Sequence, residues 1–147
     1  MNSTTGYIVF AHGSSVESAN DAVRAVAEEF ARRGSYAAVQ VAFLEGGRPD
    51  LAGAVAALAQ GGFHNVVVIP YFLTLGTHLQ RDLPKLVEQA RASHAGITIA
   101  VTPPLDGHPA LLDALADRAA GMDRAAGADR AAGADRAAGA DLAAERK

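Results

Sequence analysis

The fold is decided by the stretch Asn65-Val66-Val67-Val68-Ile69-Pro70-Tyr71-Phe72, a nearly continuous apolar run. A strand with one solvated face alternates apolar and polar residues, and this run does not alternate. Continuous apolar runs are typical of parallel strands that are covered on both faces. The stretch therefore predicts an α/β protein in which helices flank a parallel sheet.

The sequence on either side of this run alternates between short apolar segments and segments with helical periodicity. Strands are predicted at 7–11, 39–44, 65–72 and 97–101, and helices at 17–33, 50–60, about 83–93 and 109–120. This order requires right-handed crossovers, so we expect a single α/β domain with a four-stranded parallel sheet flanked by helices. In the first helix, the residues expected to face the sheet are Ala19, Val23, Val26, Ala27 and Phe30. Gly34 is expected to end that helix, and Asp50 to begin the next.

Composition limits the class of protein. The chain has 147 residues, of which 50% are hydrophobic, enough for one compact core. A net charge of −3 gives no sign of a nucleic-acid-binding face, and the absence of cysteine excludes disulfides and thiolate metal sites. The polar N-terminus does not resemble a secretory signal, and no apolar stretch approaches the roughly 20 residues that span a bilayer. We therefore expect a soluble cytoplasmic protein without nucleic-acid or membrane partners.

The C-terminal part has a different sequence character. Near-copies of Arg-Ala-Ala-Gly-Ala-Asp recur every six residues and begin at Arg118, Arg124, Arg130 and Arg136. On a helix, successive copies point about 120° apart and form no apolar stripe. Alanine favours a helix, whereas each glycine opposes it by about 1 kcal/mol. We expect a domain over residues 6–120 and a low-complexity repeat tail over 121–147 that either extends the last helix or is disordered.

The predicted strands sort the histidines between the two edges of the sheet. Four chemically active residues follow predicted strands, namely His12, His78, His108 and Glu45. They should lie at the carboxyl edge, which is where α/β sheets bind ligands. His64 and His94 precede strands, so we expect them at the opposite edge as solvated loop residues.

Imidazole is a good ligand for divalent cobalt, nickel, iron or zinc, and a carboxylate can complete such a site. A site made of His12, His78 and Glu45 would leave coordination positions open, as a catalytic metal site needs. The sequence thus predicts that His12 and His78 hold a metal.

Other interpretations stay open at this stage. Ser14 or Ser15 could cap the first helix, which would make His12 an ordinary loop residue. His108 precedes Pro109 and is equally well explained as a turn residue. A Ser–His–acid hydrolase is disfavoured because the Gly-x-Ser-x-Gly elbow is absent. Phosphate-binding and dinucleotide-binding glycine motifs are also absent.

Two motifs carry a resemblance to a known family. One is His12-Gly13-Ser14 after the first strand, and the other is Phe-Leu-x-x-Gly-x-His-x-x-x-Asp-Leu-Pro over residues 72–84. Both resemble the class II tetrapyrrole chelatases, the CbiX/SirB family of sirohydrochlorin chelatases. Segments 42–45 and 104–109 also look like family sequence. The resemblance covers roughly residues 6–120, which are therefore expected to be a CbiX-like chelatase domain.

The resemblance implies a lyase that forms metal–nitrogen bonds. The family histidines that match His12 and His78 hold or deliver the metal, and Glu45 is our candidate for the proton acceptor or third ligand. The implied substrates are sirohydrochlorin and a divalent metal ion, Co²⁺, Fe²⁺ or Ni²⁺, with no organic cofactor. The product would serve cobalamin or siroheme biosynthesis.

Cationic side chains near the same edge are expected to orient sirohydrochlorin, because it carries many carboxylates. The candidate tetrapyrrole-binding residues are Ser14, Gly76, Arg81 and Lys85, with Arg48 nearby and with Gly46 and Gly47 leaving room for a flat ligand. For the cationic residues the alternative is an ordinary solvated face. The family pattern usually continues His-Gly-Ser-Arg, whereas this chain has Ser15 at that position.

Two further expectations follow from the resemblance. Longer family members carry two such domains in tandem, so a single domain is expected to form a homodimer, the commonest closed oligomer. The alternative function is a non-catalytic metal or tetrapyrrole carrier that uses the same two histidines. A carrier would bind without accelerating metal insertion.

Overall fold

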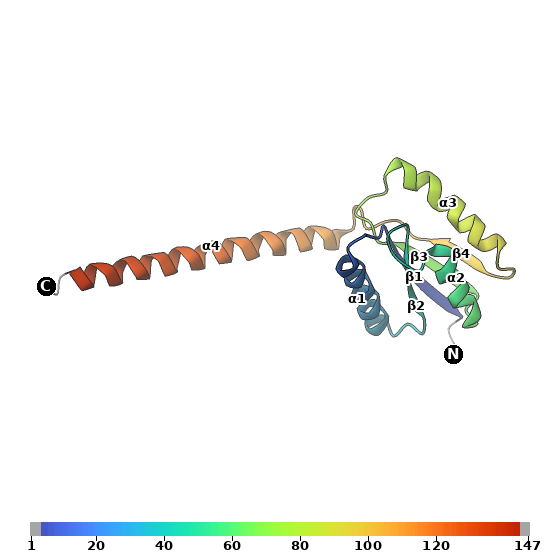
Figure 1. The fold of residues 1–147 in the computed structure, drawn as a ribbon, viewed down its shortest axis with the longest axis horizontal. Coiled ribbons are helices and arrows are strands. Elements are labelled where there is room, and N and C mark those ends of the chain that lie inside the picture. The colour runs from blue at the N-terminus through green and yellow to red at the C-terminus, as the bar shows by residue number, and fades with distance from the viewer. Residues whose placement is uncertain (1–3, 145–147) are drawn as a thin grey trace. The chain divides into compact units, whose positions relative to one another are not determined.

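The structure is a computed structural model that describes residues 4–144, with side chains described for residues 4–133. Figure 1 labels its helices and strands in chain order. They are β1 (Thr5–Ala11), α1 (Glu17–Gly34), β2 (Val39–Phe43), α2 (Leu51–Gln60), β3 (Asn65–Pro70), α3 (Thr77–Ala92), β4 (Thr98–Val101) and α4 (Pro109–Ala144).

The strands form one parallel sheet in the order β2-β1-β3-β4. In its register, Ile8 of β1 lies between Gln40 of β2 and Val68 of β3, and Val68 pairs with Val101 of β4. The predicted α/β fold is thereby confirmed, with the strand order of flavodoxin-like sheets. Because every pair is parallel, all the strands end at the same edge.

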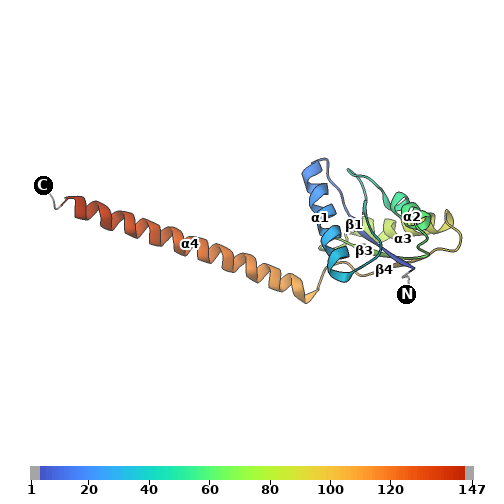
Figure 2. The ribbon, with the colours of Figure 1, turned by 90° about the horizontal axis from the view of Figure 1, so that it is seen from below.

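Helices cover the sheet from two sides, with α1 on one face and α2 and α3 on the other (Figures 1 and 2). The core lies under α2 and α3, where Ile8 and Phe10 of β1 are fully buried together with Leu58 of α2 and Leu83 of α3. On the α1 face, the ring of Tyr7 packs edge-on against Phe30 with 6.0 Å between centroids. Burial of these apolar side chains is the main stabilising term.

The strand that decided the fold is buried unequally on its two faces. Val66, Val68 and Pro70 are buried against α2 and α3, whereas Val67 and Ile69 are half-buried. The continuous apolar run thus correctly predicted a parallel strand, but its burial is complete on one face only.

Helix α3 begins earlier than the sequence predicted. Gly76 precedes its first turn and its carbonyl accepts the Gln80 N–H at 3.0 Å. Proline favours the first turn of a helix, yet Pro84 lies inside α3, where its missing N–H removes one helical hydrogen bond. As a consequence, His78 lies in the first turn of α3 and not in a loop.

The end of α1 also differs from the prediction by one residue. Gly34 is the last helical residue, and Ser35 adopts the left-handed conformation with φ 52°. A Cβ at Gly34 would lie 2.0 Å from the ring of Tyr36, so a larger residue there would require that ring to move. At the next helix, Asp50 caps α2 as predicted and accepts the Gly53 N–H at 2.8 Å.

The inward stripe of α1 contains a polar residue that the prediction omitted. Ala27 is buried as expected, but Ala19 and Val26 are exposed. Asn20 points inward instead and is 1% exposed.

The chain divides into two compact units, and the second begins at Gly107. Its helix α4 starts at Pro109, where His108 accepts the Ala110 N–H on Nδ1 at 3.1 Å and the Leu111 N–H on its carbonyl at 3.0 Å. The structure continues α4 beyond residue 120 into the repeats. Within the described part of the chain, no helix is both long and apolar enough to cross a membrane.

Removal of residues 123–147 should leave the fold nearly unchanged, because the repeats offer almost no apolar surface to bury. We expect the melting temperature to change by less than about 2 °C, measured by circular dichroism. Leu83→Ala serves as the control, since this side chain is 4% exposed and its truncation should cost about 2–5 kcal/mol. A drop of more than about 5 °C in the truncated protein, which corresponds to about 1 kcal/mol or more, would show that the tail packs.

Candidate functional site at the carboxyl edge of the sheet

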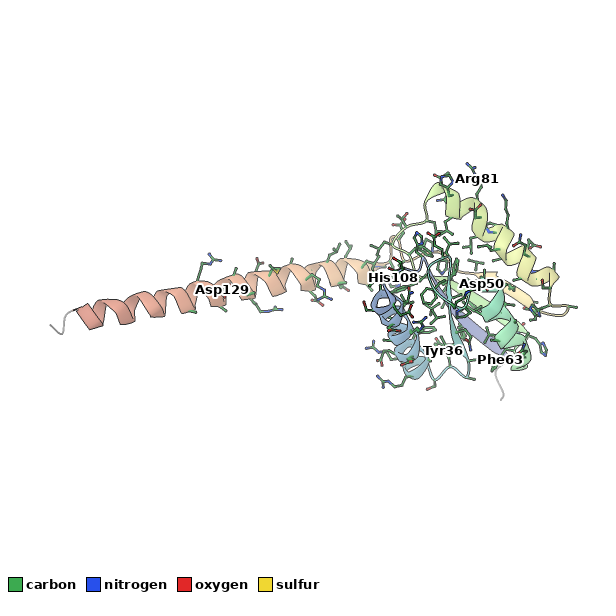
Figure 3. The ribbon with its side chains drawn as sticks, viewed as in Figure 1. Tyr36, Asp50, Phe63, Arg81, His108 and Asp129 are labelled. Carbon is green, nitrogen blue, oxygen red and sulfur yellow. The ribbon has the colours of Figure 1, made fainter. Side chains whose placement is uncertain are left out.

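The parallel sheet brings three of the predicted site residues to one edge. His12 directly follows β1, Glu45 follows β2 by two residues, and His78 follows β3 in the first turn of α3. His64 directly precedes β3 and His94 precedes β4, so both lie at the opposite edge, as expected. Figure 3 labels a residue toward each edge of the sheet. Arg81 lies near the start of α3, toward the carboxyl edge, and Phe63 lies just before β3, at the opposite edge.

His12 and Glu45 are held side by side by their own backbones. Beyond the strand ends, the Leu44 N–H donates to the Ala11 carbonyl at 2.9 Å and the Glu45 N–H donates to the His12 carbonyl at 3.0 Å. Nδ1 of His12 lies 3.6 Å from Oε1 of Glu45, which is close enough for an ion pair but too long for a hydrogen bond. The two side chains are 60% and 72% exposed, so a ligand in solvent can reach both.

Two glycines permit this close approach. Gly13 has φ 88°, and a Cβ there would lie 1.7 Å from the carbonyl oxygen of Glu45. Gly46 has φ 67°, and its Cβ would lie 2.8 Å from the backbone of Ser14. Only glycine tolerates both the positive φ and the short distance. The room that was expected at Gly46 for a flat ligand is therefore filled by the neighbouring loop.

His78 belongs to the same edge but sits on a different element. It is exposed at the start of α3, after Gly76, around which no heavy atom lies within 4 Å of an added Cβ. The ring of His12 has Phe72 as an aromatic neighbour, with 6.4 Å between centroids. Among the described residues, no group of three or more His, Asp or Glu is arranged to hold a metal. The structure thus pairs His12 with Glu45, and it brings His78 to the same edge from the first turn of α3.

The serines after His12 do not cap α1 in the way that was considered. Val16 occupies the N-cap position and no side chain caps the first turn. The hydroxyl of Ser14 accepts the Val16 N–H at 3.0 Å, within the loop itself. The capping interpretation was therefore wrong, and the backbone of Ser14 is bound by Asn20 instead.

A cleft of about 620 Å³ opens beside Glu45 between α1 and the residues that follow β2. Arg48 lines it, in agreement with its expected place near the rim, and Arg24 of α1 lines it as well. Arg24 donates to Glu17 at 2.6 Å and to Asp21 at 2.7 Å. The hydrogen bond between Arg24 and Glu17 is the main reason that the pKa of the Glu17 carboxyl is lowered from its ordinary value. The same hydrogen bond is the main reason that the pKa of Arg24 is raised.

The remaining predicted residues have separate positions. Arg81 and Lys85 are both exposed on α3. His108 belongs to the second unit, where it accepts a hydrogen bond at the start of α4. Asn20 and Arg24 were missed by the sequence analysis. Their spacing could have revealed them, because Asn20 and Arg24 lie on the same inward stripe of α1 as Ala27. A polar residue on such a stripe needs hydrogen-bond partners in the fold.

Large apolar side chains are exposed after the strands that carry the site. Val16, Leu44, Tyr71 and Leu73 are 58%, 36%, 37% and 69% exposed. They follow β1, β2 and β3 at the same edge as His12. The edge that carries His12 and Glu45 thus also exposes apolar side chains.

Comparison with known proteins identifies the family. The CbiX family model matches residues 6–121, which are most of the chain. The chain belongs to the CbiX family.

Curated relatives of this CbiX chain include enzymes named for two metals. It is 34% identical over 113 residues to the chloroplastic sirohydrochlorin ferrochelatase of Arabidopsis thaliana, covering 77% of this chain and 50% of that one. It is 28% identical over 115 residues to the sirohydrochlorin cobaltochelatase of Sulfurisphaera tokodaii, covering 77% and 89%. The chain thus spans about half the length of the Arabidopsis relative, and 56% of a Methanopyrus kandleri cobaltochelatase.

A solved structure with similar architecture is described as a cobalamin (vitamin B12) biosynthesis CbiX protein from Marinobacter aquaeolei VT8. It is 29% identical, with a TM-score of 0.73, and the match covers 82% of this chain and 98% of that one. SirB from Bacillus subtilis with Fe³⁺ has a TM-score of 0.64 at 22% identity, covering 69% and 40%. The likeness to SirB concerns the fold alone.

The glycine contacts of this CbiX domain generate a stability prediction. Gly13→Ala should lower the free energy of unfolding by about 3 kcal/mol or more, because it adds a clash with Glu45 to the strain of a positive φ. The matched control is Gly62→Ala, where φ is 83° and nothing lies within 4 Å, so only about 1 kcal/mol of strain is expected. Urea unfolding measures both values. Equal losses in the two variants would contradict the close approach of the two loops.

Proposed function

We propose that this protein is a sirohydrochlorin chelatase, which inserts a divalent metal ion into a tetrapyrrole. The observation that carries the proposal is the exposed pair of His12 and Glu45 at the carboxyl edge of a CbiX fold. The names of the relatives support the reaction class, since they include sirohydrochlorin chelatases for iron and for cobalt.

The reaction exchanges two protons for one metal ion. The macrocycle loses two pyrrole N–H protons, and the divalent cation loses water as it forms bonds to the ring nitrogens. In this proposal, His12 and His78 bind the cation through neutral imidazoles while water leaves. Nδ1 of His12 faces Glu45, so Nε2 is the nitrogen assigned to the metal. Glu45 accepts one of the two pyrrole protons and the other passes to solvent water; alternatively Glu45 completes the ligand set and both protons pass to water.

The edge around these residues suits a flat anionic ligand. We assign the exposed Leu44, Tyr71 and Leu73 to the apolar face of the macrocycle. Arg48, Arg81 and Lys85 are assigned to its peripheral carboxylates, because cationic side chains form strong hydrogen bonds with such groups.

Several finer points belong to the same proposal. Imidazole accepts cobalt, iron and nickel alike, so Co²⁺ is proposed as the first metal to test, with Fe²⁺ and Ni²⁺ as alternatives. We propose that the protein is cytoplasmic. We also propose that it is a homodimer, in which a second copy takes the place of the second domain of longer family members and faces the carboxyl edge. The pathway would be cobalamin or siroheme biosynthesis.

The histidines provide the test of this function. His12→Ala and His78→Ala should each lower the initial rate of Co²⁺ insertion by about 100-fold or more, because loss of a ligand exceeds the effect of losing an outer-shell partner. The rate is followed by the change in sirohydrochlorin absorption after Co²⁺ is added to the full-length protein.

The matched controls are His64→Ala and His94→Ala at the opposite edge, whose rates should stay within about twofold of the parent. If His78→Ala inserts Co²⁺ at the rate of the parent protein, the two-histidine site is contradicted, and so is the chelatase proposal. Tight binding of Co²⁺ or sirohydrochlorin by the unmodified protein, without faster insertion, would instead indicate a carrier.

A further inference from the structure

We propose that Asn20 is a positioning residue for this reaction and that its buried amide fixes His12 and Glu45 relative to each other. The inference rests on the proposed function. It concerns two loops, the β1–α1 loop (residues 12–16), which begins with His12, and the β2–α2 loop (residues 44–50), which contains Glu45.

The side chain of Asn20 binds both loops at once. Its Oδ1 accepts the Ser14 N–H at 2.9 Å, and its Nδ2 donates to the Ser14 carbonyl at 2.9 Å. The same Nδ2 donates to the Gly46 carbonyl at 2.9 Å and to Oε2 of Glu17 at 3.2 Å. Asn20 of α1 therefore connects Ser14, which follows Gly13 in the β1–α1 loop, to Gly46, which follows Glu45 in the β2–α2 loop.

The orientation of this amide is determined by its partners. A backbone N–H can only donate and backbone carbonyls can only accept, so rotation of the amide by 180° would lose all three of its hydrogen bonds to the loops. Asn20 is 1% exposed, so water cannot replace those bonds. A buried polar group left without partners is destabilising, so the amide is held in one orientation.

Arg24 supports the β2–α2 loop from the next turn of α1. Its guanidinium donates to the Arg48 carbonyl at 3.3 Å and lies 5.3 Å from the centre of the Phe43 ring. Ion pairs with Glu17 and Asp21 orient it. Helix α1 thus holds this loop at Gly46 and again at Arg48, on the C-terminal side of Glu45.

These contacts predict an effect on turnover that a residue serving only to stabilise the fold would not produce. The Glu45 carboxylate is 72% exposed and has no packing that would fix it near His12, so its place follows from the backbone of its loop. If Asn20 acts by setting this geometry, its removal should damage turnover only while the Glu45 carboxylate is present. A purely structural asparagine would damage both backgrounds equally.

The test is a double-mutant cycle between Asn20→Ala and Glu45→Gln, with kcat and KM for Co²⁺ insertion measured on the full chain. We expect Asn20→Ala to lower kcat about tenfold in the parent and less than about twofold in the Glu45→Gln background. The KM for sirohydrochlorin should change less than kcat does, because Tyr71, Arg81 and Lys85, also assigned to the macrocycle, lie on other elements. Equal factors in the two backgrounds would overturn the proposal.

Asn65 provides matched controls for the chemistry of the substitution. It is exposed at the start of β3, at the opposite edge, where it bonds to Thr4 at 3.1 Å and to Thr98 at 2.9 Å. Asn65→Ala and Asn65→Asp should leave kcat within about twofold of the parent. Asn20→Asp keeps the acceptor for the Ser14 N–H but loses the donors, so it should lower kcat at least as much as Asn20→Ala. Parental turnover in Asn20→Asp would contradict the role of the Gly46 contact.

A measurement on the unmodified protein covers the case in which the Asn20 variants do not fold. The side-chain amide protons of Asn20 should exchange with solvent at least about tenfold more slowly than those of Asn65, as seen by NMR. Equal exchange rates would show that the amide does not hold the loops. Absence of turnover in the parent protein would contradict the proposed function, and the exchange measurement would still decide whether the contact exists.

Discussion

The backbone of Gly13 packs against the carbonyl of Glu45 so closely that no side chain fits between them. This contact joins the loops after β1 and β2, and the geometry of the site depends on it. Parallel pairing brings the two strand ends to one edge, and the hydrogen bond from the Glu45 N–H to the His12 carbonyl continues the pairing past the strands. An imidazole and a carboxylate are therefore neighbours because of backbone contacts, while both side chains stay open to solvent.

Helix α1 contacts both loops through hydrogen bonds from Asn20 and Arg24. Most inward positions of a surface helix carry apolar side chains, whereas α1 places Asn20 and Arg24 there. Buried polar groups specify a single geometry when all their hydrogen bonds are made, and the described residues include no buried side-chain donor or acceptor without a partner. The polar stripe of α1 thus couples the packing of the fold to the position of Glu45.

The sequence predicted the architecture well because its signals were local. The apolar run at β3 and the helical periods on either side predicted a parallel sheet, and that sheet decided which histidines share an edge. The start of α3 was predicted six residues too late, and the structure accommodates Pro84 inside the helix that begins at Thr77. Asn20 was missed because its partners, Ser14 and Gly46, are brought together only by the tertiary fold. The relation between His78 and the pair of His12 and Glu45 is likewise a tertiary property that no spacing along the chain specifies.

In the proposed mechanism, His12 and His78 hold one metal ion at the carboxyl edge. The most direct test is to add Co²⁺ to apoprotein labelled with ¹⁵N at histidine and to follow the imidazole signals by NMR. We predict that the signals of His12 and His78 broaden or shift together at one equivalent of Co²⁺ per chain, while those of His64 and His94 at the far edge keep their positions. Undisturbed signals from His12 and His78, or equal changes in His64 and His94, would contradict the account.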